Sequence, residues 1–304
     1  MSIQSRLVFS YAGLTPDDEL LSWVSAGSVG GVVLFKDNAA DVSRLRGAIA
    51  TLRQQAPGPF RVMIDEEGGR VRRLPDGPGS MRDLRAYRDE GPEAAALAYT
   101  AVADHLHSLG IDTLLAPVVD IGHPQSEWLR PRTFSDNADE VAAMARLAIS
   151  AVQRRGVSCC AKHFPGTRTV TIDPHGGPAD DPTPPSTWDA TNAVPFRAAI
   201  VAGVDLVMVG HQRLLGFDAT RPACLSPVVI SVLLRQRLGF IGLVVTDDLA
   251  MGAIARQYPI EVAVAGALDA GCNLALVCND RVRQRRAVSA YHEWAASRAQ
   301  PSVL

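Results

Sequence analysis

The sequence predicts an α/β fold, a (β/α)8 TIM barrel that forms a single domain over residues 1–304. Three observations predict it: eight short apolar runs, helical patterns between most of them, and no linker or shift in composition that would mark a second domain. Hydrophobic residues make up 47% of the chain, enough for a sizeable core. Eight strand–helix units in about 250 residues or more are typical of this barrel.

The strands are predicted where short apolar runs stand between polar segments. Several runs are apolar almost throughout, which is typical of strands buried on both faces in a parallel sheet. The eight runs are 6–13, 31–35, 61–65, 113–120, 157–164, 205–211, 242–248 and 274–279.

Helices are predicted between the runs from the spacing of their apolar residues. The segment 139–155 places apolar residues at helical spacing, namely Val141, Met144, Leu147, Ala148 and Val152. Farther along, Ser226 is a typical N-cap residue and Pro227 a typical first helical residue. The apolar segment VVISVLLRQRL follows them, and Gly239 is expected to end this helix.

A doubly wound open sheet is the alternative fold. No Gly-rich dinucleotide-binding or P-loop motif supports it. Two long polar connections, 66–92 and 165–188, are rich in Gly, Pro, Asp and Arg. Long loops in a compact domain usually carry function, so we expect functional residues in these two.

Charge, the length of the apolar runs and cysteine content indicate which partners and which cellular compartment to expect. The net charge is −2, from 30 basic and 32 acidic residues without like-charge blocks, so neither nucleic acid nor an anionic membrane is expected as a partner. The amino terminus lacks the pattern of a signal peptide, and no apolar run reaches about 18 residues. The five cysteines match no zinc spacing and suit a reducing compartment. We therefore expect a cytoplasmic protein.

Polar side chains follow several of the predicted strands. A TIM barrel gathers its chemistry at the carboxyl ends of its strands, so these residues are expected around one mouth. They are Asp65, Glu66, Glu67, Arg70, Arg73, Asp120, Lys162, His163, Asp173, His175, His211, Asp247 and Asp248.

Each of these residues also has a purely structural explanation. An aspartate at a strand end often caps the next turn, as Asp120 and Asp248 would, and a lone histidine such as His211 is often structural. Glu66 and Glu67 would then be solvated or paired with the arginines that follow them. No metal or cofactor is expected, because the first strand ends in SYAGL without a ligand and no His/carboxylate cluster has ligand spacing.

Six motifs in order resemble glycoside hydrolase family 3, in particular its single-domain bacterial β-N-acetylhexosaminidases of the cell-wall recycling type. The resemblance runs from about residue 6 to residue 280, and AKHFPG with the downstream Asp-x-His is its most specific part. The motifs are IDEEGGRVRRLP (64–75), RTFSDN (132–137), AKHFPG (161–166), Asp173-x-His175, RQRLGFIGLVVTDDLAMGA (235–253) and AGCNLALVCND (270–280).

The resemblance implies cleavage of β-linked N-acetylglucosamine from cell-wall fragments, with retention and through a glycosyl-enzyme. It implies that Asp247 is the nucleophile, His175 the acid/base and Asp173 the partner that orients His175. The implied substrate is a small carbohydrate, either a muropeptide or a chito-oligosaccharide that contains N-acetylglucosamine. The implied sugar-binding residues are Asp65, Arg73, Arg132, Lys162 and His163.

The chemistry of these residues fits the implied roles. A nucleophilic carboxylate such as Asp247 has to stay ionised, and a nearby cation such as Lys162 favours that. A histidine, with an ordinary pKa of about 6.5, exchanges protons near neutrality. An aspartate that accepts one ring N–H of His175 would fix its tautomer, and Pro174 between the two restricts the backbone. We expect this Gly/Pro/Thr loop to close over substrate.

The chain departs from the family pattern at Thr167-Arg168, where His-Gly is usual, and at Pro174, where a small polar residue is common. Other activities stay open at this point. The enzyme could be a β-glucosidase or another β-glycosidase of the family, or a glycoside phosphorylase. The chain could also be a sugar-binding protein without catalysis. The oligomeric state is not predicted.

Overall fold

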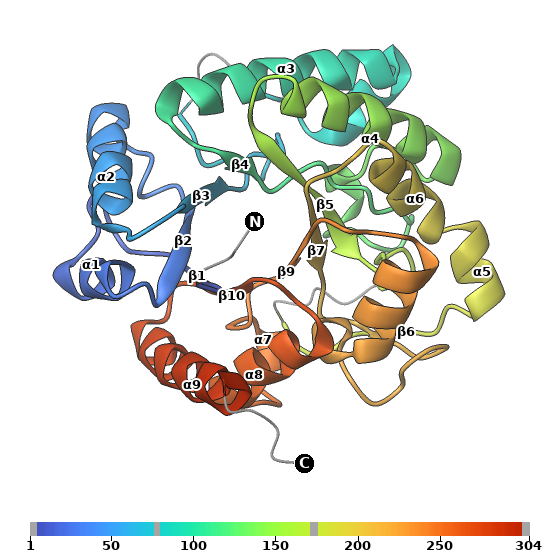
Figure 1. Cartoon of the computed structure of the whole chain (residues 1–304). Helices are drawn as coiled ribbons and strands as arrows, with labels where there is room; N and C mark the ends of the chain where they lie inside the picture. Colours follow the sequence, from blue (N-terminus) through green and yellow to red (C-terminus); the bar gives the residue numbers. More distant parts are fainter. Residues whose placement is uncertain (1–4, 76–79, 171–175, 300–304) are drawn as a thin grey trace.

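The computed structural model describes residues 5–75, 80–170 and 176–299. Eight parallel strands form a ring that helices surround, which confirms the predicted (β/α)8 barrel (Figure 1). The strands follow one another around the ring in the order β10-β1-β2-β3-β4-β5-β7-β9. They are β1 (Leu7–Phe9), β2 (Val29–Leu34), β3 (Arg61–Ile64), β4 (Thr113–Leu114), β5 (Ser158–Phe164), β7 (Leu206–Val209), β9 (Leu243–Thr246) and β10 (Ala275–Val277).

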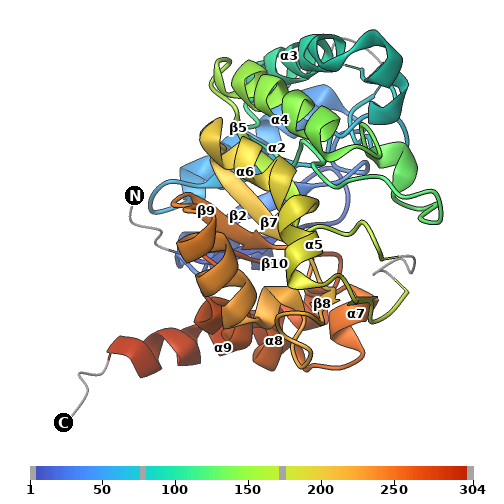
Figure 2. The same ribbon diagram turned by 90° about the vertical axis from the view of Figure 1, so that its right-hand side faces the viewer.

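Helices pack around the outside of the ring. The α-helices are α1 (Asp18–Ser25), α2 (Val42–Gln55), α3 (Pro92–Leu109), α4 (Ala138–Gln153), α5 (Pro185–Ala190), α6 (Ala193–Val201), α7 (Gly252–Ala255), α8 (Ile260–Ala270) and α9 (Arg281–Ala299). Shorter 3₁₀ segments are η1 (Leu84–Glu90), η2 (Arg130–Arg132) and η3 (Ala223–Leu225), and η4 (Val228–Arg237) is a π-helix. Figure 2 shows α7 and β8 (Arg213–Leu214) at the end of the barrel away from the N-terminus.

The ring closes between its last two strands through a narrow contact. Val245 of β9 forms a parallel bridge with Leu274, and the Thr246 amide donates to the Leu274 carbonyl at 3.0 Å. Asn273 supports this junction, because its side-chain oxygen accepts the Val244 amide at 2.8 Å. The carboxyl ends of β9 and β10 are thereby brought to the same mouth as those of the other strands.

The core has two parts, because side chains alternate across each strand. Cys159 packs into the larger cluster between the strands and the helices, whereas its neighbour Cys160 belongs to a second cluster. That second cluster takes one side chain or more from most strands, among them Val8, Met63 and Leu276, and fills the inside of the barrel.

The predicted helices are present, with one difference in type. The helix expected over 139–155 is α4, Ala138–Gln153. Ser226 caps the next predicted helix, since its Oγ accepts the Val229 amide at 3.2 Å, and Gly239 ends it with a φ of +73°. This helix, η4, has π rather than α hydrogen bonding, as the bond from the Leu238 amide to the Leu233 carbonyl at 3.0 Å illustrates.

Three predicted loops or strands are structured differently from the expectation. The fourth strand, predicted over 113–120, is only Thr113–Leu114. The chain beyond it stays hydrogen-bonded to β5, because the Ala116 carbonyl accepts the Cys160 amide at 3.0 Å and Val118 forms a parallel bridge with Lys162. The connection 66–92 contains η1. The connection 165–188 contains β6, Asp180–Asp181, which pairs in parallel with β8.

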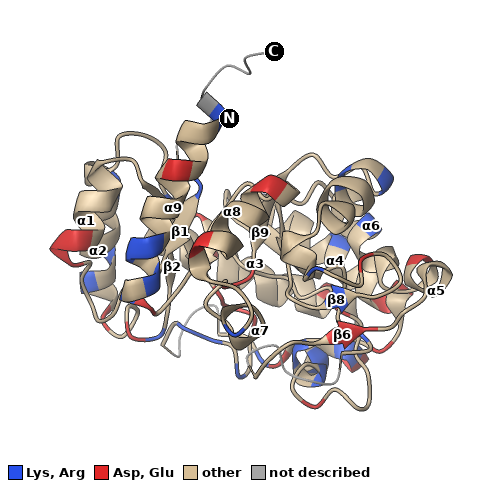
Figure 3. Ribbon diagram, turned by 90° about the horizontal axis from the view of Figure 1, so that it is seen from below, with Lys and Arg blue, Asp and Glu red and all other residues tan. Residues whose placement is uncertain are grey.

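Figure 3 shows basic and acidic residues interspersed over the helices and loops around the barrel. Within the described ranges, no helix combines the length and the apolar character needed to cross a bilayer. All five cysteines are buried free thiols.

Candidate active site

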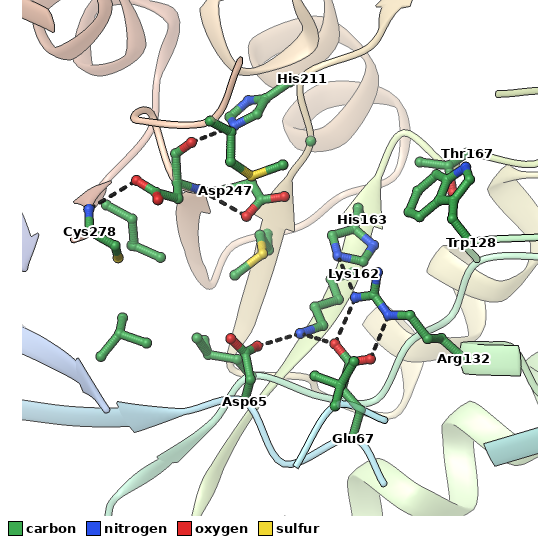
Figure 4. Close-up of a pocket in the computed structure, with 18 of the residues that line it drawn as sticks. Asp65, Glu67, Trp128, Arg132, Lys162, His163, Thr167, His211, Asp247 and Cys278 are labelled. Atoms are coloured by element: carbon green, nitrogen blue, oxygen red, sulfur yellow. Dashed lines mark hydrogen bonds and ion pairs between the residues drawn. The ribbon is translucent and has the colours of Figure 1, made fainter. Parts of the chain in front are cut away.

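A pocket opens at the carboxyl ends of the barrel strands, as predicted for the chemistry of this fold (Figure 4). All five predicted sugar-binding residues and the predicted nucleophile line it. The polar lining residues are Asp65, Glu67, Arg73, Trp128, Arg132, Lys162, His163, Thr167, His211, Gln212, Asp247 and Asp248.

Lys162 is the centre of a buried charge network at one wall of the pocket. Its Nζ lies 2.6 Å from Asp65 Oδ1 and 2.6 Å from Glu67 Oε1. Arg132 completes the network by donating from Nε and Nη2 to the two oxygens of Glu67, each at 2.8 Å. The side chains of Lys162 and Glu67 are each only 2% exposed, so these charges interact with one another rather than with water.

Burial and charge pairing oppose each other in this network, and pairing prevails. Burial alone raises the pKa of Glu67, but Arg132 and Lys162 hold it well below its usual range. Burial likewise lowers the pKa of Lys162, but Asp65 and Glu67 raise it above its ordinary value. Both groups therefore stay charged at neutral pH, and their oxygens and N–H groups can bind the hydroxyls of a ligand.

His163 is fixed by a second buried carboxylate, Asp120. The ring Nδ1 lies 2.7 Å from Asp120 Oδ2, which also accepts the His163 backbone amide at 3.0 Å. The other oxygen of Asp120 accepts the Thr167 amide at 2.9 Å. Because an aspartate accepts the Nδ1 proton, Nε2 of His163 is directed to the pocket side, 3.4 Å from Arg132 Nη2.

Asp247 closes β9 at another wall of the pocket. Its backbone amide donates to the Val209 carbonyl at 2.9 Å, and its Oδ1 accepts the Asp248 amide at 2.8 Å. Burial raises its pKa, but the imidazoles of His211 and His163, the Asp248 amide and Lys162 together lower it below the ordinary value of 3.8. Lys162 thus acts in the predicted direction, although the two histidines act more strongly.

Asp248 and His211 keep the end of β9 in place. Asp248 Oδ1 accepts the Ala250 and Cys278 amides, each at 2.9 Å, which is the capping role expected for it. His211 Nε2 lies 2.8 Å from the Asp248 carbonyl and Nδ1 lies 3.3 Å from Cys224 Sγ. His211 is therefore held as a structural residue, and it also lowers the pKa of Asp247.

Neither Glu66 nor Glu67 is solvated, which removes one of the two structural explanations considered for them. Glu67 is part of the buried network. Glu66 is also buried, and its Oε2 accepts the amides of Arg73 at 2.7 Å and Leu74 at 3.0 Å. Through these two bonds, Glu66 fixes the segment that carries Arg73. The Arg73 Nη2 lies 3.7 Å from Asp65 Oδ2, and its guanidinium lies over the Phe35 ring.

The buried Glu66 predicts a pH effect on stability. Burial raises the pKa of Glu66 above the ordinary 4.5, so the folded state binds more protons than the unfolded state at pH values between the unfolded and the folded pKa. The protonated Glu66 therefore contributes to stability fully below pH about 4.5, and this contribution is lost as pH rises through the folded pKa. Glu66→Gln keeps an acceptor for the two amides but cannot ionise. We expect the variant to gain stability relative to the wild type as pH rises above 4.5, measured by urea unfolding at several pH values.

In that experiment Glu261→Gln, a change at an exposed ion pair with Arg286, serves as control. The difference between this control and the wild type should show no rise over the same window. If the difference in free energy of unfolding between Glu66→Gln and the wild type does not change with pH, the raised pKa of Glu66 is contradicted.

The chain after β5 is tied to neighbouring loops. Thr169 Oγ1 donates to Asp181 Oδ1 at 2.6 Å, and the same oxygen accepts the Thr183 amide at 2.8 Å. Arg213 donates to the two carboxylate oxygens of Asp180 at 2.7 and 2.9 Å.

The predicted acid/base residues Asp173 and His175 lie outside the described residues. Among the residues that are described, no three His, Cys, Asp or Glu side chains gather as ligands for a metal ion.

The sequence analysis placed Glu67 and Asp120 at the mouth of the barrel but assigned neither of them a role in the site. A signal for Glu67 was present, because it follows Asp65 by two positions, and alternate residues of an extended segment lie on one face. Asp120 offered no such signal, since capping and orienting aspartates look alike at a strand end. Trp128, which lines the pocket from the loop after β4, was not singled out either.

A family model described as the glycosyl hydrolase family 3 N terminal domain matches residues 5–297. The chain belongs to glycoside hydrolase family 3. The matched residues include all eight strands of the barrel.

Proteins similar to this chain include a beta-hexosaminidase of Xylella fastidiosa strain 9a5c, 36% identical over 280 residues that cover 90% of this chain and 83% of the relative. A solved family 3 β-N-acetylglucosaminidase of Paenibacillus sp. FPU-7 superposes with a TM-score of 0.93 at 31% identity over 97% of this chain. The chain spans only 58% of that protein. A β-N-acetylhexosaminidase of Beutenbergia cavernae superposes with a TM-score of 0.88 at 27% identity, covering 98% of this chain and 92% of the other.

Proposed function

We propose that this family 3 glycoside hydrolase is a retaining exo-β-N-acetylglucosaminidase that removes terminal β-linked N-acetylglucosamine. The observation that carries the proposal is the placement of Asp247, a half-buried carboxylate with a lowered pKa directly after β9, in one pocket with the Asp65–Lys162–Glu67 network. Figure 4 shows these groups on different sides of the same cavity. The names of similar proteins, β-hexosaminidase and β-N-acetylglucosaminidase, support the choice of sugar.

In the proposed reaction a carboxylate oxygen of Asp247 attacks C1 of the sugar. His175, oriented by Asp173, gives its proton to the glycosidic oxygen as the C1–O bond breaks. The deprotonated His175 then takes a proton from water, whose oxygen attacks C1 and releases Asp247 as a carboxylate. Two inversions at C1 give net retention.

The binding groups suit a sugar whose C1 lies next to Asp247. Asp65 and Glu67 supply acceptors, and Lys162, Arg132 and Arg73 supply charged donors for its hydroxyls. The natural substrates we propose are small N-acetylglucosamine-containing muropeptides or chito-oligosaccharides. We further propose a cytoplasmic role in cell-wall recycling, which rests on the family resemblance.

A panel of chromogenic glycosides tests this function. We expect cleavage of 4-nitrophenyl N-acetyl-β-glucosaminide, with kcat/KM well above that for the matching β-glucoside. Turnover that depends on inorganic phosphate and yields a sugar phosphate would replace hydrolysis by phosphorolysis. A preference for the glucoside would make the protein a β-glucosidase. Absence of turnover for every glycoside, in a folded protein that still binds sugar, would leave only a binding function.

A further inference from the structure

Four residues that line the pocket each carry a buried polar atom with no hydrogen-bond partner in the described part of the chain: Arg73 at Nε, Gln212 at Oε1, Thr167 at Oγ1 and Trp128 at Nε1. The Arg73 guanidinium has an ionic neighbour, since its Nη2 lies 3.7 Å from Asp65 Oδ2, whereas the other three side chains are uncharged. Gln212 is fully buried and Thr167 is 2% exposed. Buried polar groups are normally paired, and an unpaired one costs free energy, so three of them at one pocket indicate that a ligand completes their bonds.

These three residues occupy one region of the pocket, which we call the β5–β7 corner. Gln212 Nε2 donates to the carbonyl of Gly166 at 2.9 Å, beside Thr167, and this bond fixes which end of the amide is left unpaired. A Cβ added at Gly210 would lie 2.5 Å from Gln212 Oε1 and 3.4 Å from His163 Cβ, which places that oxygen near His163. Trp128 and Thr167 lie on the same side of the pocket in Figure 4.

The order of the strands relates this corner to a bound sugar. β7 lies between β5, which carries Lys162 and His163, and β9, which ends at Asp247. If C1 is at Asp247 and the far hydroxyls are at Lys162, one edge of the pyranose faces the end of β7. A pyranose has two such edges, C2–C3 and C5–O5, and the chemistry of the β5–β7 corner decides which of them faces it.

An acetamido group matches what the corner offers. Its N–H needs an acceptor, such as Gln212 Oε1, and its carbonyl needs a donor, such as the Thr167 hydroxyl or the Trp128 N–H. Its methyl group needs an apolar surface, and Trp128, Met208 and Met251 line the same pocket. A 2-hydroxyl is too short to reach several of these groups at once and would leave some of them unpaired.

We propose that Trp128, Thr167 and Gln212 form the subsite that recognises the 2-acetamido substituent and so select N-acetylglucosaminides over glucosides. This inference rests on the proposed function and adds the residues that determine its substrate specificity. It also assigns a role to Thr167, which belongs to one of the two segments where the chain departs from the family pattern.

Thr167→Val is the sharpest test, because it keeps the shape of the side chain and removes only the hydroxyl. The Asp120 bond is unaffected, since the backbone amide makes it. The Thr167 hydroxyl has no hydrogen-bond partner among the described residues, so the melting temperature of the variant should equal or exceed that of the wild type. Thr167→Ser, which keeps the hydroxyl, is the matched variant.

The first measurement is the rise in melting temperature caused by N-acetylglucosamine and by glucose, which reports binding without turnover. We expect the wild type to respond more to N-acetylglucosamine, Thr167→Val to lose most of this preference and Thr167→Ser to keep it. A wild type that responds equally to both sugars, or to neither, overturns the subsite whatever the protein hydrolyses. So does a Thr167→Val variant with an unchanged preference.

The second measurement is kcat/KM for the two chromogenic glycosides. Loss of one hydrogen bond should lower kcat/KM for the N-acetylglucosaminide about five- to tenfold in Thr167→Val and leave the glucoside within about twofold. An equal fall for both glycosides would show a general structural effect and contradict the proposal. If Thr167→Val does not fold, Trp128→Phe decides by the same criteria, with Trp294→Phe on α9 as its control.

Discussion

Replacing Asp247 with asparagine lowers kcat for 4-nitrophenyl N-acetyl-β-glucosaminide by roughly 10⁴-fold or more, as expected when the nucleophile of a covalent mechanism is removed. The amide cannot form the ester with C1. It is nearly isosteric, and its Oδ1 can still accept the Asp248 amide, so the fold is retained. Steady-state kinetics with a far-UV spectrum and a melting curve measure both parts of this expectation.

Asp248→Asn is the control for this prediction, because the two aspartates are adjacent and end the same strand. Asp248 uses one oxygen to accept two backbone amides, and an asparagine oxygen can do the same. This variant should therefore retain a readily measurable rate. If Asp248→Asn is the inactive variant and Asp247→Asn is not, the nucleophile has been assigned to the wrong carboxylate.

Glu67→Gln should lower the free energy of unfolding by about 3–5 kcal/mol, because removal of one partner from a buried ion pair leaves the others unneutralised. Glu67 neutralises Lys162 and Arg132 together, at 2.6 and 2.8 Å, and all three are shielded from water. Urea unfolding at pH 7 measures this loss.

The folded pKa of Glu67 is depressed, so its contribution to stability exists above the unfolded pKa, near 4.5, and is lost as pH falls through the folded pKa. The difference between Glu67→Gln and the wild type should therefore be largest at neutral pH and shrink in acid. Glu261→Gln, at the exposed pair with Arg286, should leave unfolding almost unchanged. A Glu67→Gln protein as stable as this control would contradict a structural role for the network.

The barrel could be predicted from the sequence because strands buried on both faces are apolar almost throughout. Seven of the eight apolar runs contain one barrel strand each, and the run 31–35 overlaps β2, which begins two residues earlier, at Val29. The π hydrogen bonding of η4 could not be predicted, since its apolar residues fit an α-helix equally well. The β6–β8 pair was missed because two-residue strands leave no periodic pattern.

The site was predictable where a residue ends a strand and faces the pocket, as Asp65, Lys162 and Asp247 do. The roles of Glu66 and Glu67 could not be separated from composition alone, because adjacent residues of like charge differ only in the direction their side chains take. The corner formed by Trp128, Thr167 and Gln212 was out of reach for another reason. Its signal is the absence of hydrogen-bond partners among the described residues, which only a folded structure reveals.

Covalent labelling tests the central claim most directly. A 5-fluoro N-acetylglucosaminyl fluoride carries a good leaving group, while its ring fluorine slows hydrolysis of the glycosyl-enzyme, so the intermediate accumulates. Intact-protein mass spectrometry followed by peptide mapping should find one added sugar, on Asp247, and none on the Asp247→Asn variant. An adduct on a different residue, or rapid turnover of normal substrates to the inverted anomer without any adduct, would contradict a nucleophilic Asp247 at the end of β9.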